Sequence, residues 1–474
     1  MLRTLVRLAG FTICGWHECC WKFFKTLSSA GEQAFVQTDD NPGNKHLAKN
    51  ILWLYALQGM NYLIPIVLLP YLVRVLGVGQ YGLVAFSQAI AQYFIIATDY
   101  GFNFSATKQI ALHRHDGSEV SRIFYGVMTI KIVLVAIGAA LMVSAIASIP
   151  RLRADGAIYM AAYVAVVGSA LFPVWLFQGM EQMQFISIIT GASKLIAAGS
   201  IFLLVHGPQD AIRATLLQSA GFLIAGLIGF VISIKFYAPR FRVPERRDLI
   251  QMLTEGRHLF FSTASITLNT NTNTFLVGVI AGNVQAGYFS LADKLIRAVT
   301  GLIFPFLQAG YPHIVRLIKE SREKAMQFFR RILFGGVSCG FVVGLGLLLF
   351  AKPIVHLALG RDAAGVVPVL RVVSLFPVLA VVTASMGMLI YIPFGLEKLY
   401  SRLLLAVGIA NVVLCFALIP FLGAVGAAIG MIVMESILLI GGWYLLRRNG
   451  VNLLSLQRAT SEIATLSEES ELAK

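Results

Sequence analysis

The stretch "LGVGQYG" at residues 76–82 decides how the chain is interpreted, because its three glycines reproduce the G-x-G-x-x-G pattern of dinucleotide-binding enzymes. That pattern binds a pyrophosphate where it follows a buried strand, opens a helix and precedes an acidic residue about 20 positions on. Here the preceding segment contains Pro65 and Pro70, and Asp99 lies within an apolar segment. We therefore interpret the stretch as a tight turn between two membrane spans, where glycine permits backbone conformations that other residues resist.

The composition of the whole chain indicates a membrane protein. Of its 474 residues, 57% are hydrophobic and 13% are charged, and the mean hydropathy is +0.77. A soluble globular protein carries about 25% charged residues. We predict an all-α integral membrane protein with about twelve transmembrane helices, each near the ~20 residues that cross a bilayer. They are expected at residues 51–73, 81–107, 123–149, 157–178, 185–205, 214–234, 259–280, 287–312, 328–351, 366–393, 403–419 and 424–446.

The positive charges predict the orientation of these spans. Most of the 38 Lys and Arg residues flank segments that would lie on one side of the membrane, above all "KFYAPRFRVPERR" (235–247) and "RLIKESREK" (316–324). Positively charged loops remain in the cytoplasm, so both termini are expected to be cytoplasmic. The net charge of +15 is then a topology signal. No basic-aromatic groove supports binding of nucleic acid.

A second copy of the opening stretch predicts two similar halves. Shifted by 205 positions, "LGVGQYG" aligns with "AGNVQAG" (281–287), and both copies fall between the first two spans of a six-span group. We expect two six-helix lobes related as a parallel repeat. The predicted organisation is an N-terminal cytoplasmic extension at 1–44, lobes at 45–237 and 259–447, a cytoplasmic inter-lobe linker at 238–258 and a cytoplasmic tail at 448–474.

The cysteines and short motifs predict neither a metal site nor a cofactor. The five cysteines give no plausible disulfide framework, and the spacing of Cys14, His17, Cys19 and Cys20 matches no standard zinc pattern. They are interpreted as reduced cytoplasmic thiols. The sequence contains no G-x-x-x-x-G-K-[ST] stretch, so direct use of ATP is not expected.

Several segments in a fixed order resemble a known family, the bacterial polysaccharide flippases of the O-antigen and exopolysaccharide type. These transporters belong to the superfamily that also contains multidrug antiporters, and the resemblance covers residues 45–447. The segments are "LPYLVRVLGVGQYGLVAFSQAIAQYFIIATDYGFNFSATKQIA" (69–111), "VWLFQGMEQMQFISI" (174–188), "GYFSLADKLIRAVTGLIFPFLQAGYPHI" (287–314) and "PFGLEKLYSRLLLAVGIANVVLCFALIPFLGAVGAAIG" (393–430).

The resemblance implies a transporter, not an enzyme. Its expected substrate is an undecaprenyl-diphosphate-linked oligosaccharide, moved from the cytoplasmic to the periplasmic leaflet of the bacterial inner membrane by alternating access. Polysaccharide polymerase and chain-length machinery are its potential partners, besides membrane lipids. Two alternatives remain open: a multidrug-type cation-coupled antiporter on the same fold, and a membrane-embedded polysaccharide polymerase or ligase. The first predicts an apolar or acidic cavity, and the second a substantial outer loop, which the predicted topology lacks.

Charged residues inside the predicted spans are the best pointers to a substrate path, because each costs about 2.5–3.5 kcal/mol at mid-membrane. The cationic excess among them suits an anionic diphosphate. We predict that Lys131, Lys194, Lys294, Arg297 and Arg371 bind the diphosphate, and that Asp99, Asp293 and Glu435 are charge partners or carriers of a coupled ion. Drive by the membrane potential, at about 2.3 kcal/mol per charge per 100 mV, is the alternative to ion coupling.

Two local patterns sharpen these assignments. Arg297 lies four residues after Asp293 and three after Lys294, so it can approach both on one helix face. Either the two cations bind the diphosphate, or Asp293 and Arg297 form a structural pair while Lys294 extends to the membrane surface. In "TLNTNTNT" (267–274), Asn269 and Asn273 share a helix face. They either bind sugar hydroxyls or hold neighbouring helices together.

Overall fold

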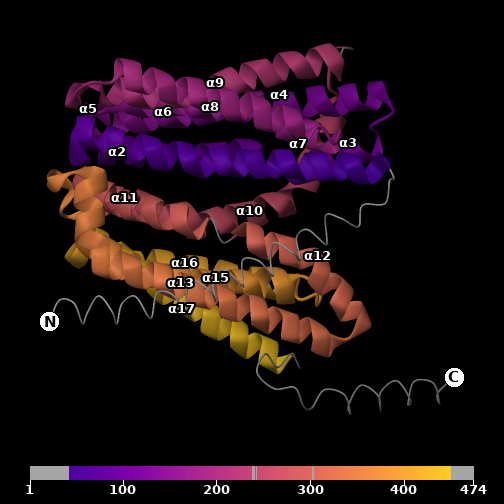
Figure 1. Cartoon of the computed structure of the whole chain (residues 1–474). Coiled ribbons are helices and arrows are strands. Elements are labelled where there is room, and N and C mark those ends of the chain that lie inside the picture. Colours follow the sequence, from indigo (N-terminus) through magenta and orange to yellow (C-terminus); the bar gives the residue numbers. More distant parts are fainter. Residues whose placement is uncertain (1–41, 238–240, 242, 302–303, 450–474) are drawn as a thin grey trace.

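The computed structural model describes residues 42–237, 241, 243–301 and 304–449. The tail from residue 450 and almost all of the predicted N-terminal extension, with Cys14, His17, Cys19 and Cys20, lie outside the described residues. All regular structure in the described ranges is helical. The helices form two bundles that lie side by side (Figure 1).

The first bundle contains the helices up to residue 236. They are α2 (Pro42–Asp99), α3 (Phe102–Leu112), α4 (Gly117–Ser148), α5 (Pro150–Ala154), α6 (Gly156–Leu171), α7 (Val174–Gly179), α8 (Met183–Leu204), η1 (Pro208–Asp210) and α9 (Ala211–Phe236).

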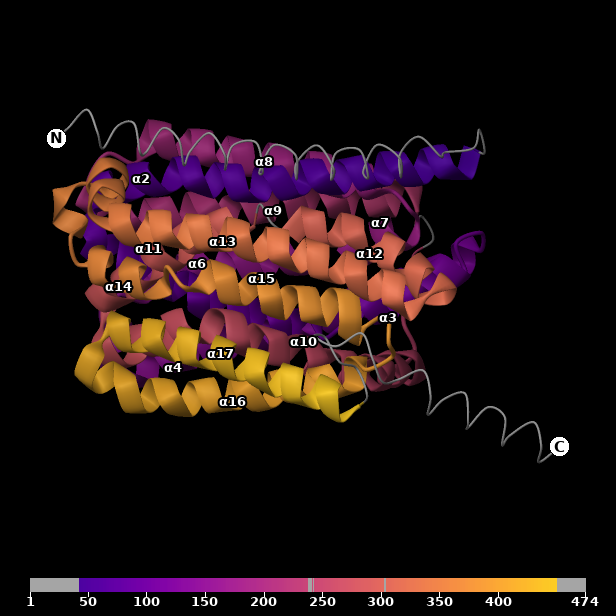
Figure 2. The same ribbon diagram turned by 60° about the horizontal axis from the view of Figure 1, so that its bottom comes forward.

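The second bundle contains the remaining helices, among which α13, α15 and α17 run side by side (Figure 2). They are α10 (Arg246–Ala281), α11 (Asn283–Thr300), α12 (Phe304–Glu320), α13 (Arg322–Leu359), η2 (Arg361–Ala363), α14 (Val366–Val373), α15 (Phe376–Met386), the π-helical η3 (Gly387–Tyr391), α16 (Glu397–Leu422) and α17 (Ala424–Arg448).

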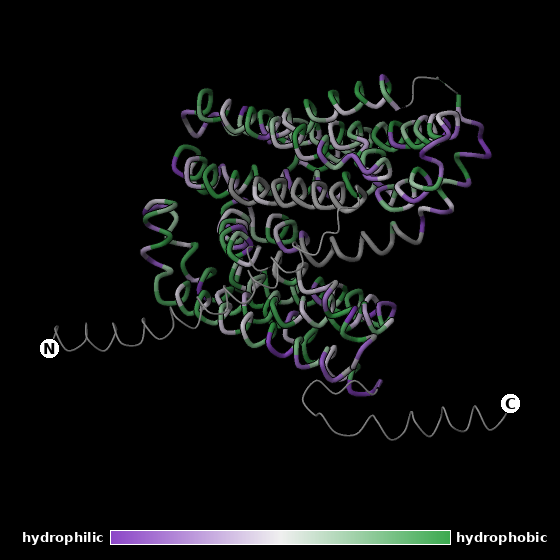
Figure 3. The backbone as a smooth tube through the Cα atoms, turned by 45° about the vertical axis from the view of Figure 1, so that its right-hand side comes forward, coloured by the Kyte–Doolittle hydropathy of each residue, from purple (hydrophilic) through white to green (hydrophobic). Residues whose placement is uncertain are grey.

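Helix length and composition identify an all-α membrane protein. Within the described ranges, nine helical segments are long and apolar enough to cross a bilayer. Hydrophobic residues follow the lengths of the helices, and many of the hydrophilic ones gather at their ends (Figure 3). The predicted span at 259–280 is not among the nine, and neither is the one at 287–312. The latter begins with α11, whose 18 residues include three charged side chains.

The two glycine-rich stretches are turns, as the sequence predicts. Gly77 has φ 74° and ψ 162° in the middle of α2, and Gly282 has φ 93° and ψ 176° between α10 and α11. Both conformations are unfavourable for residues with a Cβ. Gly77 divides α2 into two helices that fold back on each other, because Pro65 before it and Ile95 after it line one cavity.

The two bundles are in backbone contact at the end where these turns lie, here called the Gly77 end. A Cβ atom on Gly82 would lie 1.8 Å from the carbonyl oxygen of Asn283, and one on Gly287 would lie 2.6 Å from that of Val78. The two contacts are related by the 205-residue offset of the repeated stretch. Arg151 adds hydrogen bonds of 2.6 Å from the first bundle to two carbonyl oxygens at the end of α10. The bundles are therefore closed against each other at the Gly77 end.

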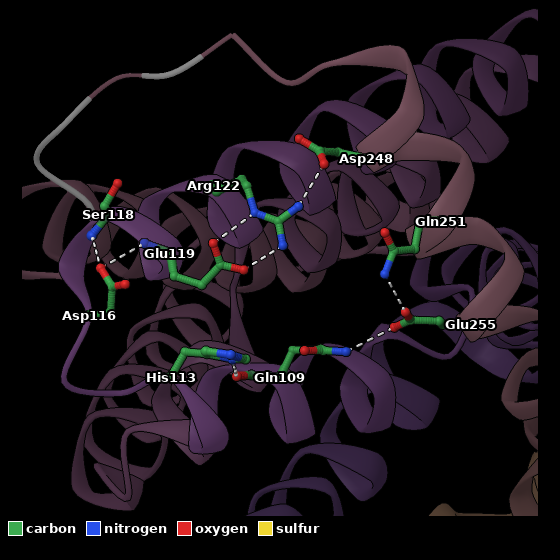
Figure 4. A network of polar contacts seen from close by, with 9 residues as sticks. All are labelled: Gln109, His113, Asp116, Ser118, Glu119, Arg122, Asp248, Gln251 and Glu255. Atoms are coloured by element: carbon green, nitrogen blue, oxygen red, sulfur yellow. Dashed lines mark hydrogen bonds and ion pairs between the residues drawn. The ribbon is translucent and has the colours of Figure 1, made fainter.

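At the opposite end, the beginning of α10 packs on the first bundle through a polar network (Figure 4). Arg122 of α4 forms an ion pair of 2.6 Å with Asp248 of α10 and a second one with Glu119. Glu255 of α10 accepts a hydrogen bond of 3.0 Å from Gln109 of α3. Since α10 already begins at Arg246, the predicted linker 238–258 is for the most part the first turns of this helix.

Several predicted spans are interrupted where the sequence pattern is continuous. The span expected at 81–107 is broken at Tyr100 and Gly101, whose φ angles are 43° and 81°. Pro173 separates α6 from α7 in the span expected at 157–178. In the span expected at 366–393, α14 ends at Val373 and α15 begins at Phe376. Apolar composition identifies membrane-embedded segments, but it does not reveal short breaks within them.

Candidate substrate cavity

A cavity of about 460 Å³ lies where α11 of the second bundle meets α2, α6, α8 and α9 of the first. Most of its wall is apolar, built from residues such as Leu69 and Ala198. Three of the predicted cationic residues line it together: Lys194 from α8 and Lys294 and Arg297 from α11. The cationic part of the cavity therefore receives side chains from both bundles.

Tyr81 holds Lys294 in place. The Nζ atom of Lys294 donates a hydrogen bond of 2.9 Å to the Tyr81 hydroxyl and lies 5.2 Å from the centroid of the tyrosine ring. Tyr81 is buried, one turn beyond Gly77. The ammonium group lies beyond the hydroxyl, so this hydrogen bond directs it to one place at the boundary between the bundles.

Arg297 is fixed by the carboxylate one helical turn before it. Its Nε atom donates to both carboxylate oxygens of Asp293 at 2.8 Å. Glu435 of α17 lies within electrostatic range of Arg297 and accepts a hydrogen bond from the Thr383 hydroxyl. The predicted pairing of Asp293 with Arg297 is present, and the same arginine lines the cavity. The structural and the binding interpretations are thus compatible.

Lys194 reaches the cavity from the other side. Its Nζ atom lies 5.9 Å from the centroid of the Phe222 ring on α9, and both residues belong to the cavity wall. Because α8 and α9 are both helices of the first bundle, the cavity has cations on two opposing sets of helices. An anion between the bundles would be approached from both.

The other charged candidates lie elsewhere. Lys131 is 1% exposed and forms an ion pair of 2.8 Å with Asp99, which also accepts a hydrogen bond of 3.2 Å from Asn103. This pair lies within the first bundle and away from the cavity wall. Arg371 is exposed on α14. The structure therefore brings together three of the five cations that the sequence predicts at one site.

The polar face of α10 connects helices. The Asn273 side-chain oxygen accepts a hydrogen bond of 2.7 Å from Asn411 of α16, and Thr272 shares one of 2.8 Å with Tyr93 of α2. Asn273 therefore has the interhelical role that the sequence left open as an alternative to sugar binding. The side chain of Asn269 lies outside the described residues.

Three further cavity residues are uncharged and were not predicted from the sequence. Gln88 and Gln92 of α2 and Gln218 of α9 line the same cavity as the cations. The repeat could have found two of them, because the 205-residue offset aligns Gln88 with Asp293 and Gln92 with Arg297. Neutral amides in register with the charged pair are therefore the sequence signal for this helix face.

Comparison with solved structures identifies the class of fold. An inward-facing MATE-family multidrug resistance transporter of the MOP superfamily matches 86% of this chain and 100% of its own, with a TM-score of 0.62 and 15% identity. The lipid II flippase MurJ in an inward closed conformation matches 84% of this chain and 87% of its own, with a TM-score of 0.65 and 14% identity. The fold is that of a polytopic membrane transporter.

Sequence comparison then identifies the family. Residues 47–318 match the family model described as "Polysaccharide biosynthesis protein". An Escherichia coli K12 protein named "Putative O-antigen transporter" is 30% identical over 84% of this chain and 96% of its own length. A Shigella dysenteriae protein of the same name is 28% identical over 83% of this chain and 98% of its own. The chain belongs to the polysaccharide biosynthesis protein family, as its sequence segments predict.

Proposed function

We propose that this protein is a flippase for an undecaprenyl-diphosphate-linked polysaccharide repeat unit in O-antigen or exopolysaccharide biosynthesis. It moves the unit from the cytoplasmic to the periplasmic leaflet of the bacterial inner membrane. The observation that carries the proposal is the convergence of Lys194, Lys294 and Arg297 on one cavity between the two bundles. The names of the Escherichia coli and Shigella relatives support the substrate class.

The chemistry of the substrate explains the cavity. A sugar hydroxyl without a partner costs about 4–8 kcal/mol in hydrocarbon, so the head group needs a polar path. The diphosphate carries negative charge that lysine and arginine side chains bind through charge-assisted hydrogen bonds. A cavity for cationic drugs would not be expected to gather three cations. The cavity therefore favours the flippase over the multidrug antiporter.

Alternating access would result from a movement of two lobes relative to each other. We propose twelve spans in two six-helix lobes, related as a parallel repeat, with both termini in the cytoplasm. The Gly77 end then faces the periplasm and is closed here by the contacts of Gly82 and Gly287. Opening this end while closing the opposite one would carry the head group outward, and the polyprenyl tail would remain in lipid.

We propose that the membrane potential supplies the driving force for outward transport. An anionic head group that moves outward gains about 2.3 kcal/mol per uncompensated charge per 100 mV. The three carboxylates considered as ion carriers each have a protein partner: Asp99 with Lys131, Asp293 with Arg297 and Glu435 with Thr383. These contacts give each carboxylate a structural role that requires no transported ion.

Replacing Arg297 with Gln tests the site. Because hydrogen bonds to charged groups are worth about 1.5–3 kcal/mol, the variant is expected to reduce flipping by about ten- to a hundredfold. Flipping is measured with purified protein in liposomes, as the transfer of lipid-linked repeat units to the leaflet accessible to an added glycosidase. Arg297→Lys should restore part of the rate, since it restores the charge.

The matched control is Arg371→Gln, which removes an exposed arginine from the same bundle. It is expected to stay within about twofold of the wild type, as surface substitutions usually do. Unchanged flipping by Arg297→Gln would remove Arg297 from the site.

Deletion of the gene tests the flippase proposal against the polymerase alternative. In cells without the gene, repeat units should accumulate on the cytoplasmic leaflet. Units that are found flipped but unpolymerised would favour the polymerase alternative.

A further inference from the structure

The first-bundle wall of the cavity carries a pair of hydrogen-bonded amides. Gln88 of α2 donates from Nε2 to the side-chain oxygen of Gln218 on α9, at 2.8 Å. Gln218 in turn donates to the carbonyl oxygen of Ala214 one turn earlier, at 3.2 Å. These bonds fix the two amides relative to each other, and both residues line the cavity.

The amides have hydrogen-bonding groups left over for a ligand. Each glutamine side chain offers two N–H donors and one oxygen with two lone pairs. Within the described part of the chain, the Gln88 oxygen and one of its N–H groups have no protein partner, and neither does the amide of Gln92 one turn further along α2. The cavity therefore presents neutral donors and acceptors side by side, in a wall that is otherwise largely apolar.

The internal repeat relates these amides to the charged pair. Gln88 occupies the position of Asp293 in the first bundle, and Gln92 occupies that of Arg297. Both helices, α2 and α11, contribute to the same cavity. The two halves thus bring different chemistry to matching positions: a carboxylate and a guanidinium on one side, and two neutral amides on the other.

We propose that Gln88, Gln92 and Gln218 form a subsite for the neutral, hydroxyl-bearing sugar that is joined to the diphosphate. This inference rests on the proposed function. A sugar hydroxyl can donate one hydrogen bond and accept others. It can therefore pair with both the N–H groups and the oxygen of a glutamine side chain. Lys194, Lys294 and Arg297 bind the diphosphate, while the α2 and α9 amides bind the adjoining sugar. If the lipid diphosphate carries no sugar, these amides lose the hydrogen bonds that the sugar would make. Sites of this kind discriminate against ligands that lack the matching polar group.

Binding of two lipids to one set of variants tests the subsite. The probes are undecaprenyl diphosphate and the lipid-linked repeat unit extracted from producing cells that lack the polymerase. Affinity is measured by microscale thermophoresis on purified full-length protein. Gln88→Leu and Gln218→Met keep the side-chain size but remove the amide. Each is expected to weaken binding of the glycosylated lipid by about tenfold, because it removes hydrogen bonds to the ligand, and to leave undecaprenyl diphosphate within about twofold.

The control variants separate this inference from the proposed function. Gln184→Met removes an amide that bonds Gln182 at 3.1 Å outside the cavity, and it should change neither affinity. Arg297→Gln should weaken both lipids alike. Equal loss of both lipids in the Gln88 and Gln218 variants, or loss of neither, would overturn the sugar subsite and leave the flippase intact. A wild-type protein that binds neither lipid above a phosphatidylglycerol control would overturn the proposed function itself.

Discussion

A disulfide between cysteines introduced as Gly79→Cys and Val284→Cys is expected to stop transport almost completely, and reduction is expected to restore it. A Cβ atom on Gly79 of α2 would lie 3.6 Å from Cγ2 of Val284 on α11. In Val284→Cys the sulfur can take the position of Cγ2, so it would lie beside the Cβ atom of residue 79, close enough for an oxidant to join the two cysteines. Because the bond would join the two bundles at the Gly77 end, it would prevent that end from opening.

The experiment needs a background without the five native cysteines and a control bond within one bundle. Gly156→Cys with Ile146→Cys supplies the control, because a Cβ on Gly156 of α6 would lie 3.0 Å from Cγ2 of Ile146 on α4. Both helices belong to the first bundle, so this bond should form without reducing flipping. Full formation of the bond between residues 79 and 284 together with undiminished flipping would show that the Gly77 end stays closed throughout the cycle.

The expected result depends on a contact that the sequence could partly predict. The alignment of residues 76–82 with 281–287 identified equivalent turns, and Gly77 and Gly282 both adopt positive φ. The alignment could not predict that the two copies touch. That contact requires the relative placement of the bundles, which arises from packing of residues far apart in the chain. It explains why Gly82 and Gly287 are glycine, since a Cβ on either would meet the facing backbone.

The residues of the candidate site could also be predicted only in part from the sequence. Residue type identified Lys194, Lys294 and Arg297, because a charged side chain inside a membrane span costs free energy and usually marks a functional site. Residue type alone could not distinguish these from Lys131, which has the same chemistry but lies opposite Asp99. Neutral glutamines carry no such cost, so charge alone did not predict Gln88 and Gln218, which line the cavity.

Lys131→Met is expected to destabilise the protein by about 3 kcal/mol, because removing one partner of a buried ion pair leaves the other charge uncompensated. Lys131 is 1% exposed, and its partner Asp99 is 23% exposed. Asp99 would keep the bond from Asn103 but lose the ammonium group 2.8 Å away. The effect should be visible as a lower midpoint of thermal aggregation in detergent and as lower abundance in the membrane.

The double variant Lys131→Met with Asp99→Asn decides whether this pair is structural or carries a coupled ion. It removes both charges together, so most of the lost stability should return, since replacing a whole buried pair by neutral groups is often close to neutral. If the pair only holds α4 against the end of α2, the double variant should also flip repeat units at near the wild-type rate. A stable double variant that cannot flip would instead assign Asp99 to ion coupling, and the drive would then not be the membrane potential alone.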